Sequence, residues 1–289
     1  MGKKIKFQKA FTLLELLVVI TIIGILSSIV IVSMSGSTDS AEIAKGKSFS
    51  QQVHALLGYE ARGVWNFDEG TVNTCSATQD ACDLSGYNNH GTFVGNTDYV
   101  ESDIEGYALS FDGTGDYVDC GEGSSSFIIG GRDHTLEAWM YPTGFASTYN
   151  YIASIGDSLT GKQSSFGIVN DLRLFLSAYS SPIAHTSYAL PALNDWYHIV
   201  MSYDGNSDTA SFYVNGEWKE DEIISLDVTV GKCRIGSNVG NGSLFIGLID
   251  EVRIYATALS RAEIRDNYVQ GLKKMLVKNV ILENNAFTE

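Results

Sequence analysis

The segment 196-WYHIVMSYDGNSDTASFYVNG-216 carries the pattern that decides the fold of this 289-residue chain. Two runs rich in β-branched and aromatic residues, Trp196–Tyr203 and Ala210–Val214, have the composition of strands. Asp204-Gly205 and Asn215-Gly216 follow them, and such dipeptides favour the tight turns of β-hairpins. We therefore predict antiparallel strands joined by hairpins in this part of the chain.

The same succession of strands and turns continues on both sides of this segment. Further expected strands are Tyr107–Phe111, Tyr117–Cys120, Thr135–Tyr141, Leu172–Leu176 and Leu244–Tyr255, with turn signals at Asp112-Gly113 and Asn241-Gly242. One late helix is expected to begin at Ser260, because Ser260-Arg-Ala-Glu263 has the form of a capping box. Many short strands at this spacing predict a mainly β fold, an antiparallel sandwich.

Composition and charge agree with a folded domain that has an acidic surface. Apolar residues make up 44% of the chain, and 29 Gly against 3 Pro fit many tight turns. Four of the 19 basic residues lie in the first ten, so the remainder has 15 basic and 34 acidic residues. Such a surface repels nucleic acid phosphates, and no nucleic-acid partner is expected. Plain solubility explains the charge equally well.

The first 32 residues combine a basic leader with a long apolar run. Lys3, Lys4, Lys6 and Lys9 precede Phe11–Val32, in which Glu15 is the one charged residue. As a helix this run would span about 33 Å, enough to cross the core of a bilayer. The lysines predict that the N-terminus stays in the cytoplasm and that the rest of the chain faces outward.

Two simpler interpretations account for less of this segment. An ordinary secretory signal has a shorter apolar region that ends at an A-x-A-like site, and this run has no such site. A simple signal anchor explains the lysines and the length. It does not explain Glu15, because a carboxylate within an apolar span costs about 2.5–3.5 kcal/mol.

Ala10-Phe11-Thr12-Leu13-Leu14-Glu15 and the apolar residues after it resemble the N-terminal motif of type IV prepilins and pseudopilins. The resemblance implies a leader at 1–10, cleavage between Ala10 and Phe11 by a prepilin peptidase, and methylation of the new Phe11 amine. It also implies that Glu15 pairs with the Phe11 amine of a neighbouring subunit, which would give a buried charge its partner. The family usually has Gly before the cut, so Ala10 leads us to expect slower processing.

Residues 33–60 are more polar, and their apolar residues fall at a loose helical spacing. We therefore expect one long hydrophobic N-terminal α-helix over 11–60. Its apolar part, about 11–32, would lie in the membrane before assembly and in a filament core afterwards.

Several segments of the remaining chain resemble the laminin-G-like, concanavalin-A-like jelly-roll family. They are Trp65-Asn-Phe-Asp-Glu-Gly70, Asp83-Leu-Ser-Gly-Tyr-Asn-Asn-His-Gly91, Ala108-Leu-Ser-Phe-Asp-Gly113, Phe212-Tyr-Val-Asn-Gly216 and Gly247-Leu-Ile-Asp-Glu-Val-Arg-Ile-Tyr255. The match covers 63–270 and implies a jelly roll there, with 271–289 as a C-terminal tail.

Domains of that family commonly bind glycans or proteins through loops or a sheet face, so the resemblance implies such a ligand here. Tyr149, Tyr151, Tyr179 and Tyr188 lie in expected loops, where they could stack on sugar rings. The alternative is that they are ordinary, partly buried residues of the sandwich.

The sequence contains no recognisable catalytic motif: it has no G-x-S-x-G elbow, no H-E-x-x-H and no Walker loop. Jelly-roll glycosidases that resemble this domain carry paired carboxylates on one strand. Asp250 and Glu251 are adjacent, so in a strand they should point to opposite faces. His198 is expected to be structural, and we predict that the chain is not an enzyme.

The resemblance also implies a structural calcium ion, because members of the family often bind one. The matching oxygen donors are Asp83 and Asn88 in a glycine-containing loop, with Asp250 from a distant strand, and Ca²⁺ takes about six to eight such ligands. The alternative is that Asp83 and Asn88 only make turn hydrogen bonds, while Asp250 pairs with Arg253.

Four cysteines are present, an even number without metal-site spacing, and an exported protein favours disulfides. Cys75–Cys82 would close a short loop, and Cys120–Cys233 would join two strands. Buried unpaired thiols are the alternative for Cys120 and Cys233.

Together these features predict a subunit of a type IV pilus-like or pseudopilus filament that displays an outward-facing binding or adhesion domain. Its partners would be copies of itself or other pilins. The precursor would sit in the cytoplasmic membrane and the mature chain in an extracellular filament at the cell surface. The alternatives are a membrane-tethered carbohydrate-binding protein that does not polymerise and an anchored glycan hydrolase. Glu15 favours the filament, because a tether does not need it.

Overall fold

The computed structural model describes residues 61–75, 78–122, 127 and 130–286, all within one compact unit, Leu57–Glu289. The helix expected over 11–60 lies outside the described residues.

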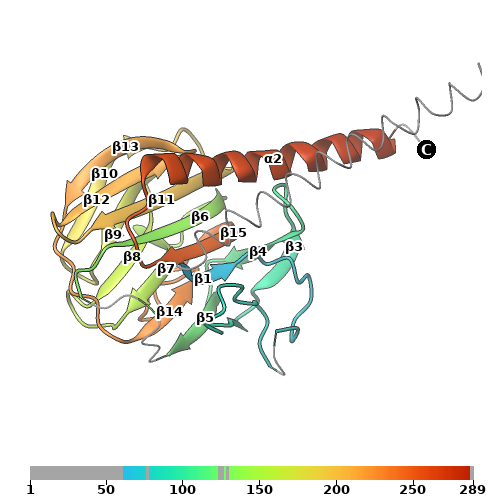
Figure 1. Ribbon diagram of the computed structural model, residues 1–289. Coiled ribbons are helices and arrows are strands. Elements are labelled where there is room, and N and C mark those ends of the chain that lie inside the picture. The colour runs from blue at the N-terminus through green and yellow to red at the C-terminus, as the bar shows by residue number, and fades with distance from the viewer. Residues whose placement is uncertain (1–60, 76–77, 123–126, 128–129, 287–289) are drawn as a thin grey trace, which may run out of the picture. The chain divides into compact units, whose positions relative to one another are not determined.

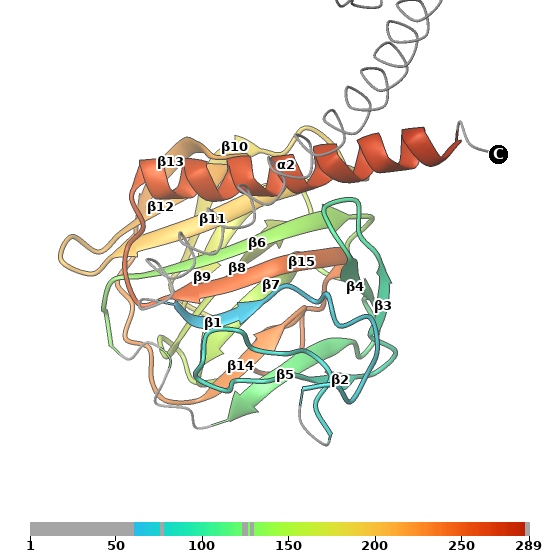
Figure 2. The same ribbon diagram turned by 45° about the vertical axis from the view of Figure 1, so that its right-hand side comes forward.

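Two antiparallel sheets make up the domain (Figures 1 and 2). The first, the β6 sheet, has the order β13 (Glu217–Ile223), β12 (Thr209–Val214), β11 (Tyr197–Asp204), β6 (His134–Pro142), β15 (Ile246–Tyr255), β4 (Tyr107–Asp112) and β3 (Asp98–Glu101), and β1 (Ala61–Trp65) also pairs with β15. The second, the β7 sheet, has the order β10 (Ile183–Ala189), β9 (Arg173–Ser177), β8 (Gln163–Val169), β7 (Tyr149–Gly156), β14 (Lys232–Ile235), β5 (Tyr117–Glu122) and β2 (Thr92–Val94). The predicted mainly β, antiparallel fold is confirmed.

The core lies between the two sheets and is built by alternation along the strands. Leu136 and Met140 of β6 face Ile155 of β7 and Phe166 of β8 across this core, and all four are buried. Burying one such side chain completely contributes about 1.5–3 kcal/mol. The residues between them point to the outer faces of the two sheets, so each sheet has a second face available for packing or binding.

The hairpin predicted within residues 196–216 is present. Strand β11 pairs with β12, and Met201 lies opposite Phe212. Asn215 and Gly216 form the two-residue turn between β12 and β13, both with positive φ (52° and 72°), which Asn and Gly tolerate better than other residues. The turn at Asp204-Gly205 is longer, because pairing resumes only at Thr209.

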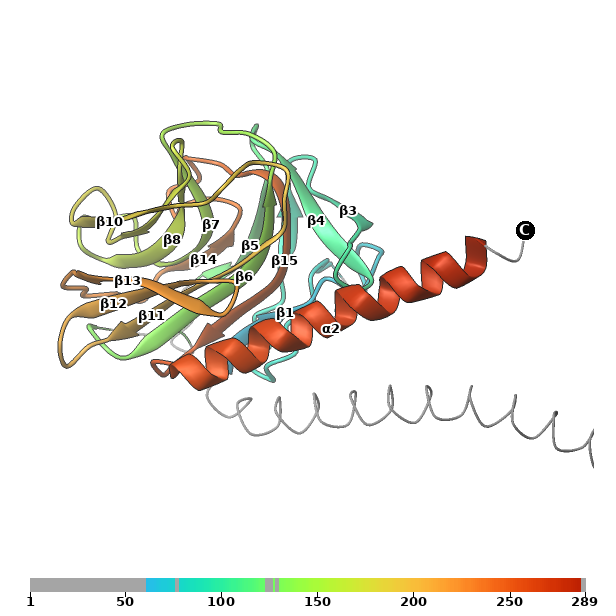
Figure 3. The same ribbon diagram turned by 90° about the horizontal axis from the view of Figure 1, so that it is seen from above.

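Helix α2 (Arg261–Ala286) lies along the outer face of the β6 sheet (Figure 3). The expected capping box is present: the backbone N–H of Ser260 donates to the Glu263 carboxylate at 2.7 Å, and the Glu263 N–H to the Ser260 hydroxyl at 3.4 Å. Tyr268 stacks on Trp139 of β6 with 5.7 Å between ring centroids. The helix continues through residue 270, where the C-terminal tail was expected to begin, because its side chains pack on the sheet.

Both predicted disulfides are present, each with its Cα atoms 5.0 Å apart. Cys75–Cys82 closes a loop between β1 and β2, whereas Cys120 of β5 and Cys233 of β14 join neighbouring strands of the β7 sheet.

Candidate binding site

The residues predicted for processing and assembly, Ala10, Phe11 and Glu15, lie outside the described residues, as does the apolar run 11–32. In the part of the chain that the structure describes, no helix combines the length and the apolar character needed to span a membrane.

Asp83, the first expected calcium ligand, is buried, and its hydrogen bonds hold its own loop together. One carboxylate oxygen accepts the backbone N–H groups of Val64 and Ser85, at 3.0 and 2.9 Å. The other accepts the Ser85 hydroxyl and the N–H of Asn89, at 2.8 and 2.9 Å. Asn88 is exposed, with a φ of 59°. These hydrogen bonds match the turn alternative, because both oxygens of Asp83 already have two protein donors.

Asp250, the third expected calcium ligand, takes different partners. Its carboxylate accepts the Ser102 hydroxyl at 2.6 Å and the backbone N–H of Glu251 at 2.7 Å, and it is 1% exposed. Asp83 and Asp250 therefore have separate hydrogen-bond partners among the described residues, which favours the turn alternative for Asp83, and the calcium site stays a prediction.

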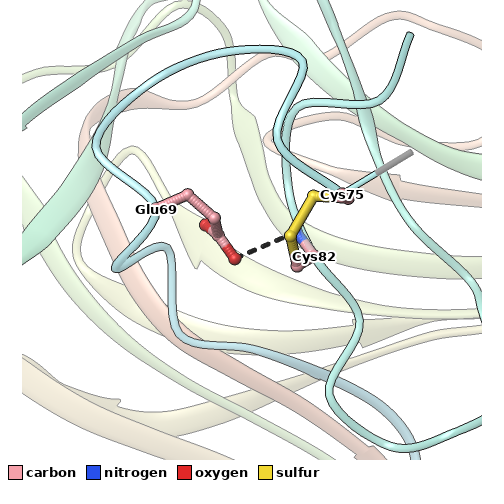
Figure 4. Close-up of side chains that lie close together, drawn as sticks. All are labelled: Glu69, Cys75 and Cys82. Atoms are coloured by element: carbon pink, nitrogen blue, oxygen red, sulfur yellow. Dashed lines mark hydrogen bonds between the residues drawn. A yellow bond between two sulfur atoms is a disulfide. The ribbon is translucent and has the colours of Figure 1, made fainter. Parts of the chain in front are cut away.

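Glu69, Cys75 and Cys82 also lie close together (Figure 4). The two sulfur atoms form the disulfide, and the Glu69 carboxylate accepts the backbone N–H of Cys82 at 3.2 Å. Glu69 therefore stabilises a loop that the disulfide closes. The two sulfur atoms are bonded to each other, so they cannot act as thiolate ligands of a metal ion.

Their adjacency predicted that Asp250 and Glu251 point to opposite faces of the sheet, and this prediction is wrong. The pairing of β15 with β6 shifts register between Asp250 and Arg253, and Glu251 has a φ of 50°, so the strand bulges here. Asp250 lies opposite Trp139, and Glu251 bonds to Lys274 of α2. Both carboxylates therefore face the helix.

Glu137 forms the centre of a buried ionic network beneath α2. It accepts hydrogen bonds from Arg253 at 2.8 Å, His198 at 3.1 Å and Asn267 at 2.8 Å. Burial alone would raise the pKa of Glu137, but Arg253 and the bonds from His198 and Asn267 outweigh it and hold that pKa below its usual value. His198 is structural, as predicted, and Arg253 pairs with Glu137 and Glu251 rather than with Asp250.

The outer face of the β7 sheet carries a row of polar side chains, here called the polar row. Its members are cross-strand partners on five successive strands: Asp119, Arg234, Ser154, Ser165 and Ser177. Directly paired residues share a face of the sheet, and the neighbouring Ile155, Phe166 and Leu176 occupy the core. The row therefore lies on the face opposite the core. Its three serines are fully buried, and Arg234 is 2% exposed.

Arg234 is held in place from several sides. Its guanidinium donates to the carboxylate of Asp119 at 2.6 Å and to the side-chain oxygen of Asn241 at 3.1 Å. It also lies over the ring of Tyr117, 5.4 Å from the centroid. The positive charge of the row is therefore matched by a carboxylate.

An aromatic cluster of Tyr149, Tyr151, Phe175 and His185 lies on the same face, beside the polar row. Tyr149 and His185 stack with 5.5 Å between centroids and 8° between planes, and a 3.1 Å hydrogen bond joins His185 Nε2 to the Tyr149 hydroxyl. Tyr151 packs against Phe175 with 4.8 Å between centroids. Burial and then Arg173 lower the pKa of His185, which disfavours protonation of the ring. Tyr151 and Phe175 are buried, whereas Tyr149 and His185 are partly exposed. Aromatic rings of this kind next to polar groups suit a ligand with both apolar and hydroxyl faces.

Tyr149 and Tyr151 lie in strand β7 and Tyr188 in β10, not in the expected loops, whereas Tyr179 lies in the turn after β9. Arg234 and Asp119 were missed by sequence reasoning. The available signal was a charged residue inside a short apolar strand, Cys233-Arg234-Ile235, which predicts a partner but not its identity.

Comparison with known proteins places these features in context. A family model described as the concanavalin A-like lectin/glucanases superfamily matches residues 112–265, more than half of the chain. A model of the prokaryotic N-terminal methylation motif matches residues 5–31. A search of curated proteins found no match.

Solved structures with the same fold include domain 4 of AbnA, an extracellular GH43 arabinanase from Geobacillus stearothermophilus, in complex with arabinotriose. The TM-score is 0.56 and the sequence identity 20%, and the match covers 72% of this chain and 97% of that one. The binding domain of Paraclostridial Mosquitocidal Protein 1 matches with TM-score 0.55, 16% identity, and coverage of 73% and 52%. The binding domain of botulinum neurotoxin DC in complex with rat synaptotagmin II has TM-score 0.55, 13% identity, and coverage of 74% and 52%. This chain thus spans about half the length of the two toxin domains, and at these identities the likeness establishes the fold.

Proposed function

The chain belongs to the concanavalin A-like lectin/glucanases superfamily, and we propose that it is a subunit of a type IV pilus-like or pseudopilus filament that presents this domain as a carbohydrate-binding module. The observation that carries the proposal is the union, on one chain, of a methylation motif at 5–31 and a lectin-like domain with an aromatic and polar outer face.

The N-terminal part supports assembly. The motif match contains Ala10, Phe11 and Glu15, so a prepilin peptidase would cut before Phe11 and the precursor would start in the cytoplasmic membrane. Glu15 in the apolar run needs a cationic partner, and the amine of a neighbouring Phe11 supplies one in a filament.

The domain supports binding rather than catalysis. Solved relatives are described as binding domains or as a domain in complex with arabinotriose. In this chain Glu137 and Glu251 form ion pairs with Arg253, and the two carboxylates also contact Asn267 and Lys274 of α2, so they help to hold the helix. The aromatic cluster on the other sheet offers stacking planes for a sugar ring.

Immunoelectron microscopy of cells that produce the full chain tests the filament role, with an antibody raised against residues 63–270. We expect labelled filaments for the wild type and a large loss of label from filaments for Glu15→Ala, with equal amounts of both proteins in the membrane. Glu101→Ala, a substitution of an exposed carboxylate on β3, serves as the control and should label like the wild type.

The membrane-tether alternative predicts a different result. Wild type and Glu15→Ala would both label the cell envelope evenly, and no labelled filament would be seen. That outcome would remove the filament role while leaving the binding role open.

A further inference from the structure

Buried polar atoms without a hydrogen-bond partner gather at two places among the described residues. His198 Nδ1 and Arg253 Nε lie in the network beneath α2. The larger group lies on the outer face of the β7 sheet, and its members are Ser154 Oγ, Ser165 Oγ, both amide atoms of Gln163 and, beside them, Thr229 Oγ1. The second group coincides with the centre of the polar row.

The register of the strands brings these groups together. Ser154 of β7 lies directly opposite Ser165 of β8, and Gln163 lies two residues before Ser165 on the same face. Thr229 adjoins this end of β8, because its backbone N–H donates to the carbonyl of Lys162 at 3.1 Å. All three side chains of β7 and β8 are fully buried.

Such an arrangement calls for a partner. A buried hydroxyl or amide left unpaired destabilises the fold, and the large majority of buried side-chain polar atoms in proteins have a partner, either protein or ordered water. Several unpaired groups at neighbouring positions make a patch that hydrogen bonds from a bound molecule would satisfy.

The chemistry of the patch selects the kind of molecule. Hydroxyl groups and a carboxamide both donate and accept, so the partner must do both as well. The guanidinium of Arg234 is already engaged by Asp119 and Asn241, so this cation is not free to bind an anion. Calcium prefers carboxylate and carbonyl oxygens, whereas this patch holds three hydroxyls and one amide. A neutral polyhydroxylated ring meets these requirements.

Two segments form a roof over the patch. Asn241, in the loop that follows β14, bonds to Arg234 at one end of the row, and the hydroxyl of Tyr179 lies 3.1 Å from the position that a β-carbon on Gly240 would take. Tyr179 follows β9, and its backbone N–H bonds to Ser177 at the other end of the row. Since β7 and β8 lie between these ends, the two segments meet above them.

The Tyr179 side of the roof is strained. Tyr179 and Ser180 are consecutive non-glycine residues in the left-handed region, with φ of 65° and 59°. Non-glycine residues rarely adopt this backbone conformation, and strain of this kind clusters at ligand clamps.

We infer that Ser154, Ser165 and Gln163 form the floor of a subsite for one neutral sugar residue, with Tyr179 as the roof that moves aside to admit it. The inference rests on the proposed function, and it narrows the ligand class from carbohydrate in general to uncharged sugars.

Titration calorimetry of the full chain, purified in detergent, tests the subsite with neutral trisaccharides, arabinotriose among them, and with trisaccharides that carry carboxylate groups. We expect the neutral sugars to bind better. Ser154→Ala, Ser165→Ala and Gln163→Met should each weaken binding by roughly threefold to tenfold, the value of one hydrogen bond. Ser207→Ala removes an exposed hydroxyl in the turn between β11 and β12, and it should bind like the wild type.

Melting temperatures of the same variants separate binding from folding. Removing an unpaired buried hydroxyl should leave the melting temperature unchanged or raise it. If neutral sugars bind and all three floor variants bind equally well, the subsite is wrong while the proposed function stands. A preference for carboxylated sugars would overturn the subsite in the same way. If no sugar binds the wild type, the proposed ligand class and the subsite fall together.

Discussion

Asp250 is a carboxylate inside the apolar strand β15, and its surroundings disfavour its charge. Burial, followed by repulsion from Glu251, raises its pKa well above the usual 3.8. The hydroxyl of Ser102 and the backbone N–H of Glu251 oppose this rise, but do not cancel it. The folded chain therefore holds a proton on Asp250 at pH values where the unfolded chain has lost it.

We predict that Asp250→Asn stabilises the protein at pH 7 by about 1–3 kcal/mol, the usual cost of a disfavoured buried polar group. Because the folded pKa is raised, wild-type stability falls as pH rises above 3.8 toward the folded value. The variant lacks this loss, so the difference in free energy of unfolding between variant and wild type should vanish near pH 3 to 4. Urea unfolding of the full chain at several pH values measures this difference. Asp171→Asn, at an exposed site, is the control, and an equal effect there would contradict the prediction.

The same variant decides the calcium question. Because Asp83 and Asp250 already have protein donors, we expect the wild-type melting temperature to be equal in calcium and in chelator. A rise in calcium that Asp250→Asn abolishes would restore the calcium site that the family resemblance implies.

At the scale of elements, the ionic network around Glu137 clamps α2 to the β6 sheet. Glu137 of β6 reaches Asn267 of the helix, and Glu251 of β15 reaches Lys274. Removing one charge from such a buried set leaves its partner in a medium of low polarity, and this usually costs about 3–5 kcal/mol.

We predict that Glu137→Gln lowers the free energy of unfolding by about 3 kcal/mol at pH 7. Its depressed pKa means that the contribution is present above 4.5 and is lost as pH falls toward the lower folded value. The gap between wild type and variant should therefore close in acid. Glu217→Gln removes an exposed partner of Lys219 and should leave stability nearly unchanged. Comparable losses for both variants in guanidinium unfolding would count against the clamp.

The disulfide between β5 and β14 gives a second prediction for the elements. Cys120 and Cys233 are 113 residues apart, and closing so long a loop restricts the unfolded chain strongly. Replacing both by Ser should lower stability by about 2–5 kcal/mol. Replacing Cys75 and Cys82, which are 7 residues apart, should lower it less. Chemical unfolding measures the loss of stability in both double variants. A larger loss for the Cys75 and Cys82 variant would contradict the explanation by loop length.

At the scale of the whole molecule, the first prediction concerns its maturation. The mature chain should begin at an N-methylated Phe11, which N-terminal mass spectrometry of native protein detects. Since the family usually has Gly before the cut, Ala10→Gly should speed processing several-fold in a pulse-chase measurement. An intact Met1, or a cut beyond Val32, would exclude prepilin processing.

Much of the architecture could be predicted from local sequence because the signals are local. The turn at Asn215-Gly216, the helix start at Ser260 and the strand runs depend on residues within a few positions of one another. The prediction that Asp250 and Glu251 point to opposite faces was wrong because β15 bulges where it pairs with β6, and the bulge changes the direction of the Glu251 side chain. The first part of the expected C-terminal tail is helical because Leu272 and Met275 pack on the cluster around Trp139.

From the sequence by itself came the mainly β domain, through strand periodicity and turn signals, and the prepilin-type start, through resemblance to the family's motif. The even number of cysteines favoured disulfides, and the structure decided their pairing. Only the tertiary structure decided which residues share the outer face of the β7 sheet. Asp119, Ser154, Ser165, Ser177 and Arg234 come from five strands, and their meeting depends on long-range register. A one-residue shift in any of these pairings would turn that strand's side chains to the other face, and no local signal fixes such a pairing.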